Sequence, residues 1–191
     1  MQVFGIIIAA LLSENYVLVK FLGICPFLGV SKRINAALGM GMAVTFVMTL
    51  SGAVTWVVYH LLLRPFGLEY LKTIAFILVI AALVQFIEMF LRKFIPALYA
   101  SLGIYLPLIT TNCAVLSAAL LAIQNEYNFI AAVSFGFASA LGFTLAIVVF
   151  AGVRGKMEFA EPPRAFKGFP IILIAAGLLA MAFAGFAGIK L

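Results

Sequence analysis

Two cysteines, Cys25 and Cys113, are the only thiols in the chain, and each lies inside an apolar stretch beside residues that disrupt helices. The disrupting residues are Gly23, Pro26 and Gly29 around the first cysteine and Pro107 before the second. Glycine and proline weaken helix continuity, and the polar run Thr110-Thr111-Asn112 could cap a new half-helix that starts near Cys113. A helix N-terminus favours the thiolate form of cysteine, which is a soft ligand for iron. The pattern therefore predicts a buried redox centre at two interrupted helices.

Other interpretations of the two cysteines are weaker. A free cysteine in an apolar helix is commonly a small packing residue, but both cysteines here lie at breaks. A disulfide is disfavoured, since the bilayer interior offers no oxidant. A [2Fe–2S] cluster needs about four ligands, and His60 and the carboxylates are poorly placed to complete the set. A second chain is therefore expected to supply the other ligands.

The composition is that of an all-α integral membrane protein. The chain has 191 residues, of which 66% are hydrophobic and 9% charged, and its mean hydropathy is +1.28. This length allows about six spans of ~20 residues each. The predicted spans are 3–30, 36–63, 73–91, 98–123, 129–153 and 169–189. The start of the chain has no charged leader or obvious small-residue cleavage site, so it is expected to be retained.

The basic residues behind the net charge of +6 are distributed unevenly between the two sides of the membrane, which indicates the orientation of the chain. With alternate loops on opposite sides, one side carries Lys32, Arg33, Arg92, Lys93, Arg154, Lys156, Arg164 and Lys167, and the other carries Arg64, Lys72 and Lys190. Loops rich in lysine and arginine stay in the cytoplasm, so both termini are expected on the outer face. A nucleic-acid-binding face would gather basic residues on one folded surface, and this distribution excludes it.

The chain is also predicted to be a single membrane domain, 1–191, made of two inverted three-helix repeats of about 1–96 and 97–191. The matched segments are Cys25 with Cys113, Gly41-Met42-Ala43 with Gly136-Phe137-Ala138, and Thr49-Leu50 with Thr144-Leu145. Three spans per half force the halves into opposite orientations. The first helix of each repeat would then be broken near the bilayer midplane.

A few polar residues inside the spans have open roles. Ionisable residues within a membrane are functional candidates, but Glu14 could also lie at the outer interface, and Lys20 is too far from it for a helical pair. Asn112 could hydrogen-bond a cluster sulfur or only cap a half-helix. His60 near Trp56 is expected in an interfacial aromatic belt.

Three segments carry a family resemblance. Glu14-Asn15-Tyr16-Val17-Leu18, residues 22–32 and residues 105–116 resemble the A-type family of Rnf complex subunits, and the resemblance extends from about Leu11 through the last span. The paralogous E-type family of the sodium-pumping NADH:quinone reductase shares the Thr-Asn-Cys-Ala segment. That family lacks the proline after the first cysteine, so Cys25-Pro26-Phe27 favours the Rnf side.

The resemblance implies a subunit of a translocase, the ion-translocating ferredoxin:NAD⁺ oxidoreductase of bacterial or archaeal cell membranes, with no complete active site in this chain alone. In that family the subunit pairs with a homologous E-type subunit of opposite topology, beside the B-, C-, D- and G-type subunits. Two cysteines from each chain hold one midplane [2Fe–2S] cluster, which relays electrons between cytoplasmic and outer-face carriers. By this resemblance the ligands here are Cys25 and Cys113. No nicotinamide or flavin is expected, and the sequence has no glycine-rich dinucleotide fingerprint.

Two alternatives remain open. One is the E-type subunit of the sodium-pumping quinone reductase. The other, from a different class, is a secondary transporter whose inverted repeats and broken helices form a solute site. The transporter interpretation explains the repeat and Asn112, but it makes the paired cysteines coincidental.

Overall fold

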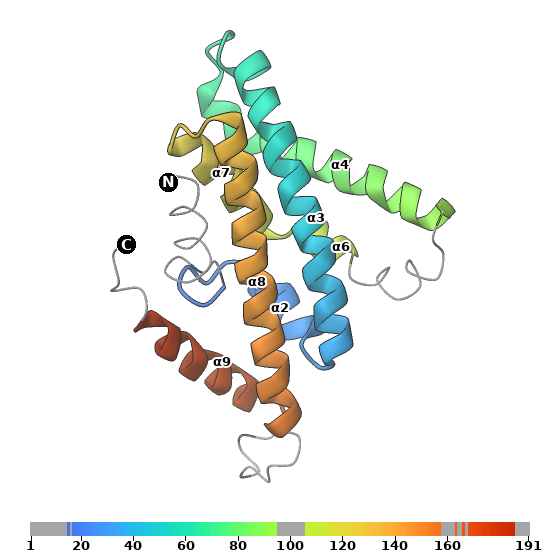
Figure 1. Ribbon diagram of the computed structural model, residues 1–191, viewed down its shortest axis with the longest axis vertical. Helices are drawn as coiled ribbons and strands as arrows, with labels where there is room; N and C mark the ends of the chain where they lie inside the picture. The colour runs from blue at the N-terminus through green and yellow to red at the C-terminus, as the bar shows by residue number, and fades with distance from the viewer. Residues whose placement is uncertain are drawn as a thin grey trace.

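A computed structural model describes residues 15, 17–94, 106–157, 163, 166 and 168–185. Within these ranges all regular structure is helical, and every predicted apolar run contains a helix (Figure 1), which confirms the all-α membrane class. The α-helices are α2 (Ile24–Val30), α3 (Ile34–Val58), α4 (Lys72–Phe94), α6 (Leu106–Thr110), α7 (Cys113–Gln124), α8 (Phe129–Met157) and α9 (Phe169–Ala184). A π-helical turn, Tyr59–Leu63, extends α3, and a 3-10 turn, Glu69–Leu71, precedes α4.

Three of the described helices are long and apolar enough to cross a bilayer. They are Ile34–Leu63, Glu69–Met89 and Phe129–Met157, and two shorter apolar helices are Leu108–Gln124 and Phe169–Ala184. The first predicted span, 3–30, lies largely outside the described residues, and its described part contains only α2. Five of the six predicted spans thus correspond to three long spans and two shorter apolar helices, and the first span stays a prediction.

The core of the molecule is the antiparallel pair α3 and α8 (Figure 1). Small residues let the two backbones approach: a β-carbon added to Gly136 would lie 3.1 Å from the carbonyl oxygen of Met48. One added to Gly41 would collide with the side chain of Thr144. Close packing of this kind holds membrane helices together, because lipid gives no hydrophobic drive between them.

The half-helix α2 begins one residue before Cys25, and Gly23 marks its start. Gly23 has φ of 79°, a left-handed conformation that suits glycine and interrupts the chain direction. Pro26 lies within the first turn of α2, where a missing N–H costs nothing. Gly23, one of the three residues predicted to disrupt the helix, therefore lies where α2 begins, with Pro26 in the first turn and Gly29 inside α2.

The second break lies a few residues after its predicted proline. Pro107 is within the described part of α6, Leu106–Thr110. The chain is interrupted between α6 and α7, at Thr111 and Asn112. Asn112 has extended backbone, with φ of −71° and ψ of 112°. The predicted half-helix that starts near Cys113 is confirmed.

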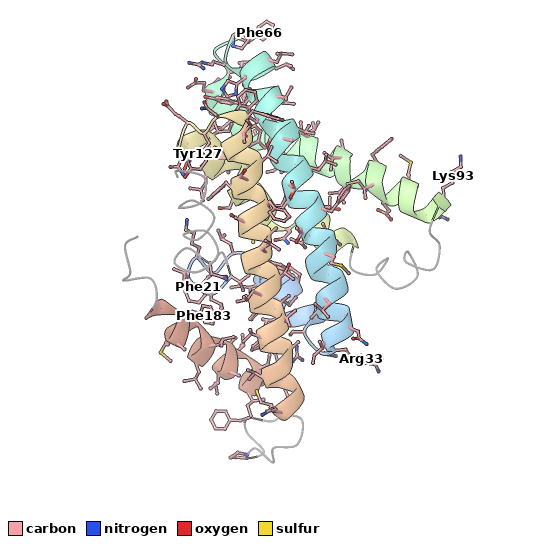
Figure 2. The ribbon with its side chains drawn as sticks, viewed as in Figure 1. Phe21, Arg33, Phe66, Lys93, Tyr127 and Phe183 are labelled. Atoms are coloured by element: carbon pink, nitrogen blue, oxygen red, sulfur yellow. The ribbon has the colours of Figure 1, made fainter. Side chains whose placement is uncertain are left out.

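The outer helices α4 and α9 splay away from the central pair on opposite sides (Figure 1). Both expose large apolar side chains, among them Leu78, Phe86, Leu178 and Met181. Figure 2 shows Arg33 towards one end of the molecule and Phe66 at the other, with Lys93 between them along the long axis because α4 runs obliquely. Faces of this kind meet lipid or neighbouring subunits in a membrane.

Candidate functional site

The two cysteine-bearing segments meet at one junction. The backbone N–H of Gly23 donates a hydrogen bond to Sγ of Cys113 at 2.9 Å, across a sequence separation of 90 residues. Cys25 follows Gly23 by two residues, which is no more than about 7.6 Å of chain. The fold therefore brings the two predicted ligands to the same place, although they belong to different halves of the chain.

Glycine is required at the centre of this junction. A β-carbon on Gly23 would lie 3.1 Å from the ring of Phe143, 3.2 Å from Cβ of Ala114 and 3.2 Å from Oδ1 of Asn112. The positive φ of Gly23 would also strain any other residue. Only glycine lets the segment before α2 come close enough to α7 to reach the sulfur.

Asn112 caps α7, as its position before Cys113 predicted. Its Oδ1 accepts a hydrogen bond from the backbone N–H of Ala114 at 3.0 Å. Cys113 is the first residue of this 12-residue helix, at the end where backbone N–H groups have no partner within the helix. The Asn112 side chain is only 5% exposed, and its Nδ2 has no hydrogen-bond partner among the described residues.

Both cysteines are free thiols, and both are exposed in the single chain. The sequence predicted a buried centre, so burial would have to come from another subunit. Among the described residues no group of three or more His, Cys, Asp or Glu side chains could hold a metal by itself. Two accessible thiols beside a buried, unpartnered amide donor fit an iron–sulfur cluster completed from outside the chain.

His60 takes no part in this junction. Its ring stacks on Trp56 with centroids 4.0 Å apart, and its Nδ1 lies 3.1 Å from the Trp56 carbonyl oxygen. Trp56 in turn donates from Nε1 to the Tyr127 carbonyl oxygen at 2.9 Å. The sequence predicted His60 in an interfacial aromatic belt near Trp56; the two rings do lie together, and their position at the membrane interface stays a prediction.

Asn15 holds the segment before the junction, a role that sequence reasoning missed. It is fully buried; its Nδ2 donates to the Gly142 carbonyl oxygen at 2.9 Å, and its Oδ1 accepts from the backbone N–H of Val17 at 3.1 Å. The sequence does contain a signal for this role, because an amide side chain inside an apolar run must find hydrogen-bond partners in the protein. Asn15 thus anchors the chain that leads to Gly23 onto α8.

Arg154 holds the other end of α2. Its Nη1 donates to the Leu28 carbonyl oxygen at 2.7 Å and lies 2.8 Å from Oγ of the buried Ser31. The last carbonyls of a helix lack partners within the helix, and the guanidinium supplies one. The sequence interpretation counted Arg154 only as an orientation charge, whereas it also fixes the half-helix that carries Cys25.

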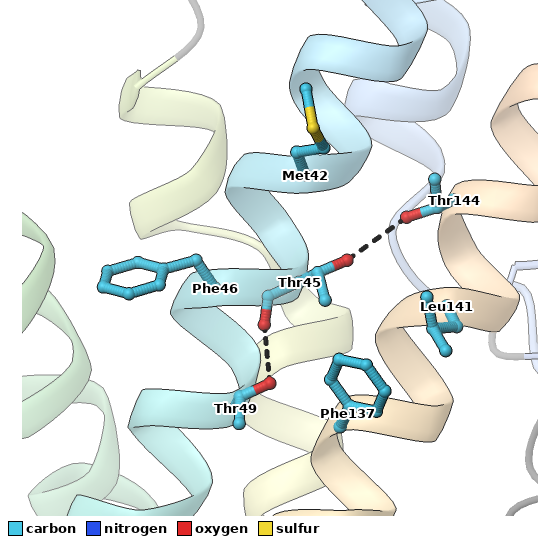
Figure 3. Close-up of a pocket in the computed structure, with 7 residues that line it drawn as sticks. All are labelled: Met42, Thr45, Phe46, Thr49, Phe137, Leu141 and Thr144. Carbon is cyan, nitrogen blue, oxygen red and sulfur yellow. Dashed lines mark hydrogen bonds between the residues drawn. The ribbon is translucent and has the colours of Figure 1, made fainter.

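A cavity of about 420 Å³ lies between α3 and α8 (Figure 3). Its lining is Met42, Thr45, Phe46, Thr49, Phe137, Leu141 and Thr144. The threonine hydroxyls donate to carbonyls of their own helices, Thr45 to Gly41 and Thr49 to Thr45, both at 2.7 Å, and Thr144 to Ala140 at 2.9 Å. With these donors occupied, the cavity offers a polar solute little beyond apolar walls.

The fold and the junction define a class: a helical membrane protein in which two interrupted segments join a pair of accessible thiols. A family model described as "Rnf-Nqr subunit, membrane protein" matches residues 3–190. The chain belongs to this Rnf-Nqr family.

Relatives support the assignment along the whole chain. The chain is 60% identical over 191 residues, all of both proteins, to the A-type subunit of the Na(+)-translocating ferredoxin:NAD(+) oxidoreductase complex of Acetobacterium woodii. It is 60% identical over 184 residues to the A-type subunit of the ion-translocating oxidoreductase complex of Syntrophotalea carbinolica, covering 96% of this chain and 95% of the relative. It is 54% identical over 182 residues to the protein of the same description in Cronobacter sakazakii, covering 95% and 94%.

Proposed function

We propose that the chain is the A-type membrane subunit of an ion-translocating ferredoxin:NAD⁺ oxidoreductase of the Rnf type. In this proposal Cys25 and Cys113 are two of the four ligands of a [2Fe–2S] cluster, and a homologous E-type subunit of opposite topology supplies the other two. The observation that carries the ligand assignment is the contact between Gly23 N–H and Cys113 Sγ, because it joins both cysteine segments. Identity of 60% to an A-type Rnf subunit over the full length favours this complex over the sodium-pumping quinone reductase.

The residues of this chain would position the thiols rather than perform a reaction. The Gly23 N–H donates to the Cys113 sulfur, and the first turn of α7 holds that sulfur in position. Arg154 fixes α2 and therefore limits the freedom of Cys25. The bound cluster would supply one-electron transfer inside the membrane, between cytoplasmic and outer-face carriers of the complex.

The inverted repeat is part of the proposal, and reciprocal contacts support it. In the alignment of the two halves, Gly41 corresponds to Gly136, and Thr49 corresponds to Thr144. Gly41 packs against Thr144, while a β-carbon on Gly136 would lie 3.8 Å from Cα of Thr49. Two elements related by a twofold axis make paired contacts of this kind.

The orientation follows from the charges at one end of the α3–α8 pair. Arg154 bonds Ser31, so Lys32, Arg33 and Lys156 lie near the same end of the pair. Loops with this many cations stay in the cytoplasm, and we assign this end to the cytoplasmic side.

Iron content in the presence and absence of the partner tests the function. The chain expressed alone should hold little iron, since it offers two thiols. Coexpressed with an E-type subunit, the purified pair should show the visible absorption of a [2Fe–2S] cluster, about one per pair. A transporter would show no such absorption in either preparation. A stoichiometric cluster in a monomer of the isolated chain would contradict the shared site.

A further inference from the structure

The amide oxygen of Asn112 accepts a hydrogen bond, whereas the amide nitrogen has no partner among the described residues. Its Oδ1 accepts from the Ala114 N–H, and this bond sets the orientation of the amide, because an N–H must face an oxygen. The other end, Nδ2, is a buried donor with no partner among the described residues. Native proteins rarely leave a buried donor unpaired, so an acceptor is expected close to Nδ2 in the assembled protein.

The free donor lies at the cysteine junction. Asn112 directly precedes Cys113, and its Oδ1 would lie 3.2 Å from a β-carbon on Gly23, the residue whose N–H binds the Cys113 sulfur. Nδ2 is bonded to the same carbon as Oδ1, so it belongs to the same small region. Two hydrogen-bond donors, one from each half of the chain, therefore belong to the region of the junction.

We propose that Asn112 Nδ2 is a hydrogen-bond donor to a sulfur of the shared cluster and that, with Gly23 N–H, it raises the reduction potential of the cluster. The inference rests on the proposed function, since the acceptor comes with the cluster. Adding an electron makes the cluster more negative, and donors to its sulfurs stabilise that form more than the oxidised one. Asn112 is thus a positioning residue that sets the potential and is not itself a ligand.

Two substitutions separate this role from helix capping. Asn112→Ser keeps an oxygen that can cap α7, since serine is a good N-cap residue, but it lacks the amide donor. Asn112→Asp keeps the shape and the capping oxygen, and it replaces the donor with a second oxygen. Ser139→Ala is the matched control, because Ser139 Oγ is the other buried polar atom without a partner among the described residues.

The experiment is a redox titration of the assembled complex followed by EPR. We expect Asn112→Ser to keep the wild-type number of spins per complex but to weaken reduction about tenfold, which is 59 mV for one electron. Asn112→Asp should shift the midpoint further in the same direction, and Ser139→Ala should leave it unchanged. An unchanged midpoint in both Asn112 variants would overturn the proposal.

A measurement on the unmodified complex covers the case in which the variants do not assemble. With asparagine labelled with ¹⁵N, pulsed EPR should detect a nitrogen coupled to the reduced cluster. If no such coupling is present, the donor role of Asn112 is wrong whatever the variants do. A wild-type complex without any cluster signal would instead contradict the proposed function, so the two failures are distinguishable.

Discussion

Gly41 of α3 lies against Thr144 of α8 so closely that there is no room for a β-carbon between them, whose position would be 2.8 Å from the threonine Oγ1. Thr144 also lies 3.4 Å, hydroxyl to hydroxyl, from Thr45, one turn along α3 (Figure 3). This close contact holds α3 against α8, and α8 borders the cysteine junction. The fully buried ring of Phe143, next to Thr144, packs against Gly23.

Enlarging Gly41 should therefore destabilise the central pair. Gly41→Val forces the helices apart, and overpacking of this kind typically costs about 1–3 kcal/mol. Gly152→Ala in α8 is the control, since a β-carbon there meets nothing within 4 Å. Thermal unfolding of the purified complex should show a lower Tm for Gly41→Val alone. Equal Tm values in the two variants would mean that α3 and α8 do not pack as described.

Gly23 should tolerate no side chain, for reasons beyond backbone strain. Gly23→Ala adds a β-carbon 3.1–3.2 Å from three neighbours and displaces the N–H that bonds Cys113. Gly67→Ala is a close control, because Gly67 also has positive φ, 64°, but has open space around it. We expect the complex with Gly23→Ala to lose most of its cluster EPR signal, and the complex with Gly67→Ala to keep it. Similar losses of the EPR signal in both variants would mean that backbone strain, and not the junction, causes the effect.

Arg154 should be needed to hold α2 in place. Arg154→Gln leaves the Leu28 carbonyl without its charged donor, and loss of such a bond typically costs about 1–3 kcal/mol. The adjacent control is Lys156→Gln, which removes an exposed charge at the same end of α8. Limited proteolysis of the assembled complex should cut the 31–33 turn faster in Arg154→Gln. Cleavage at the wild-type rate would show that the guanidinium does not restrain this turn.

The Nδ2 donor of Asn15 should be needed for assembly of the complex. Asn15→Asp keeps the oxygen that accepts from Val17 but loses the bond to the Gly142 carbonyl oxygen and buries a carboxyl group. Burying a polar group without a partner is unfavourable, so the amount of assembled complex should fall severalfold relative to wild type. The exposed Asn125→Asp serves as control. Full assembly of Asn15→Asp, measured by co-purification of the partner subunit, would rule out an anchoring role.

The fold class could be predicted from composition, because apolar runs of this length have few alternatives to membrane helices. The position of Cys25 and Cys113 at interruptions, the part of Gly23 in the first one and the cap by Asn112 could be predicted from residue types. The left-handed φ of 79° at Gly23 could not, since it depends on how the chain meets α7 and Phe143. Arg154 and Asn15 were missed for the same reason: their partners, Leu28 and Gly142, lie 126 and 127 residues away in sequence.

The most direct test of the account is the EPR spectrum of the reduced complex with Cys25→Ser or Cys113→Ser. Serine keeps the size of the side chain but removes the soft thiolate that iron–sulfur clusters prefer. The partner subunit should still co-purify with each variant, which shows that the complex has assembled. If the thiols are ligands, each single change should abolish the midplane [2Fe–2S] signal. A complex with Cys25→Ser that keeps the full signal at the wild-type potential would contradict the assignment of this chain as a cluster-holding subunit.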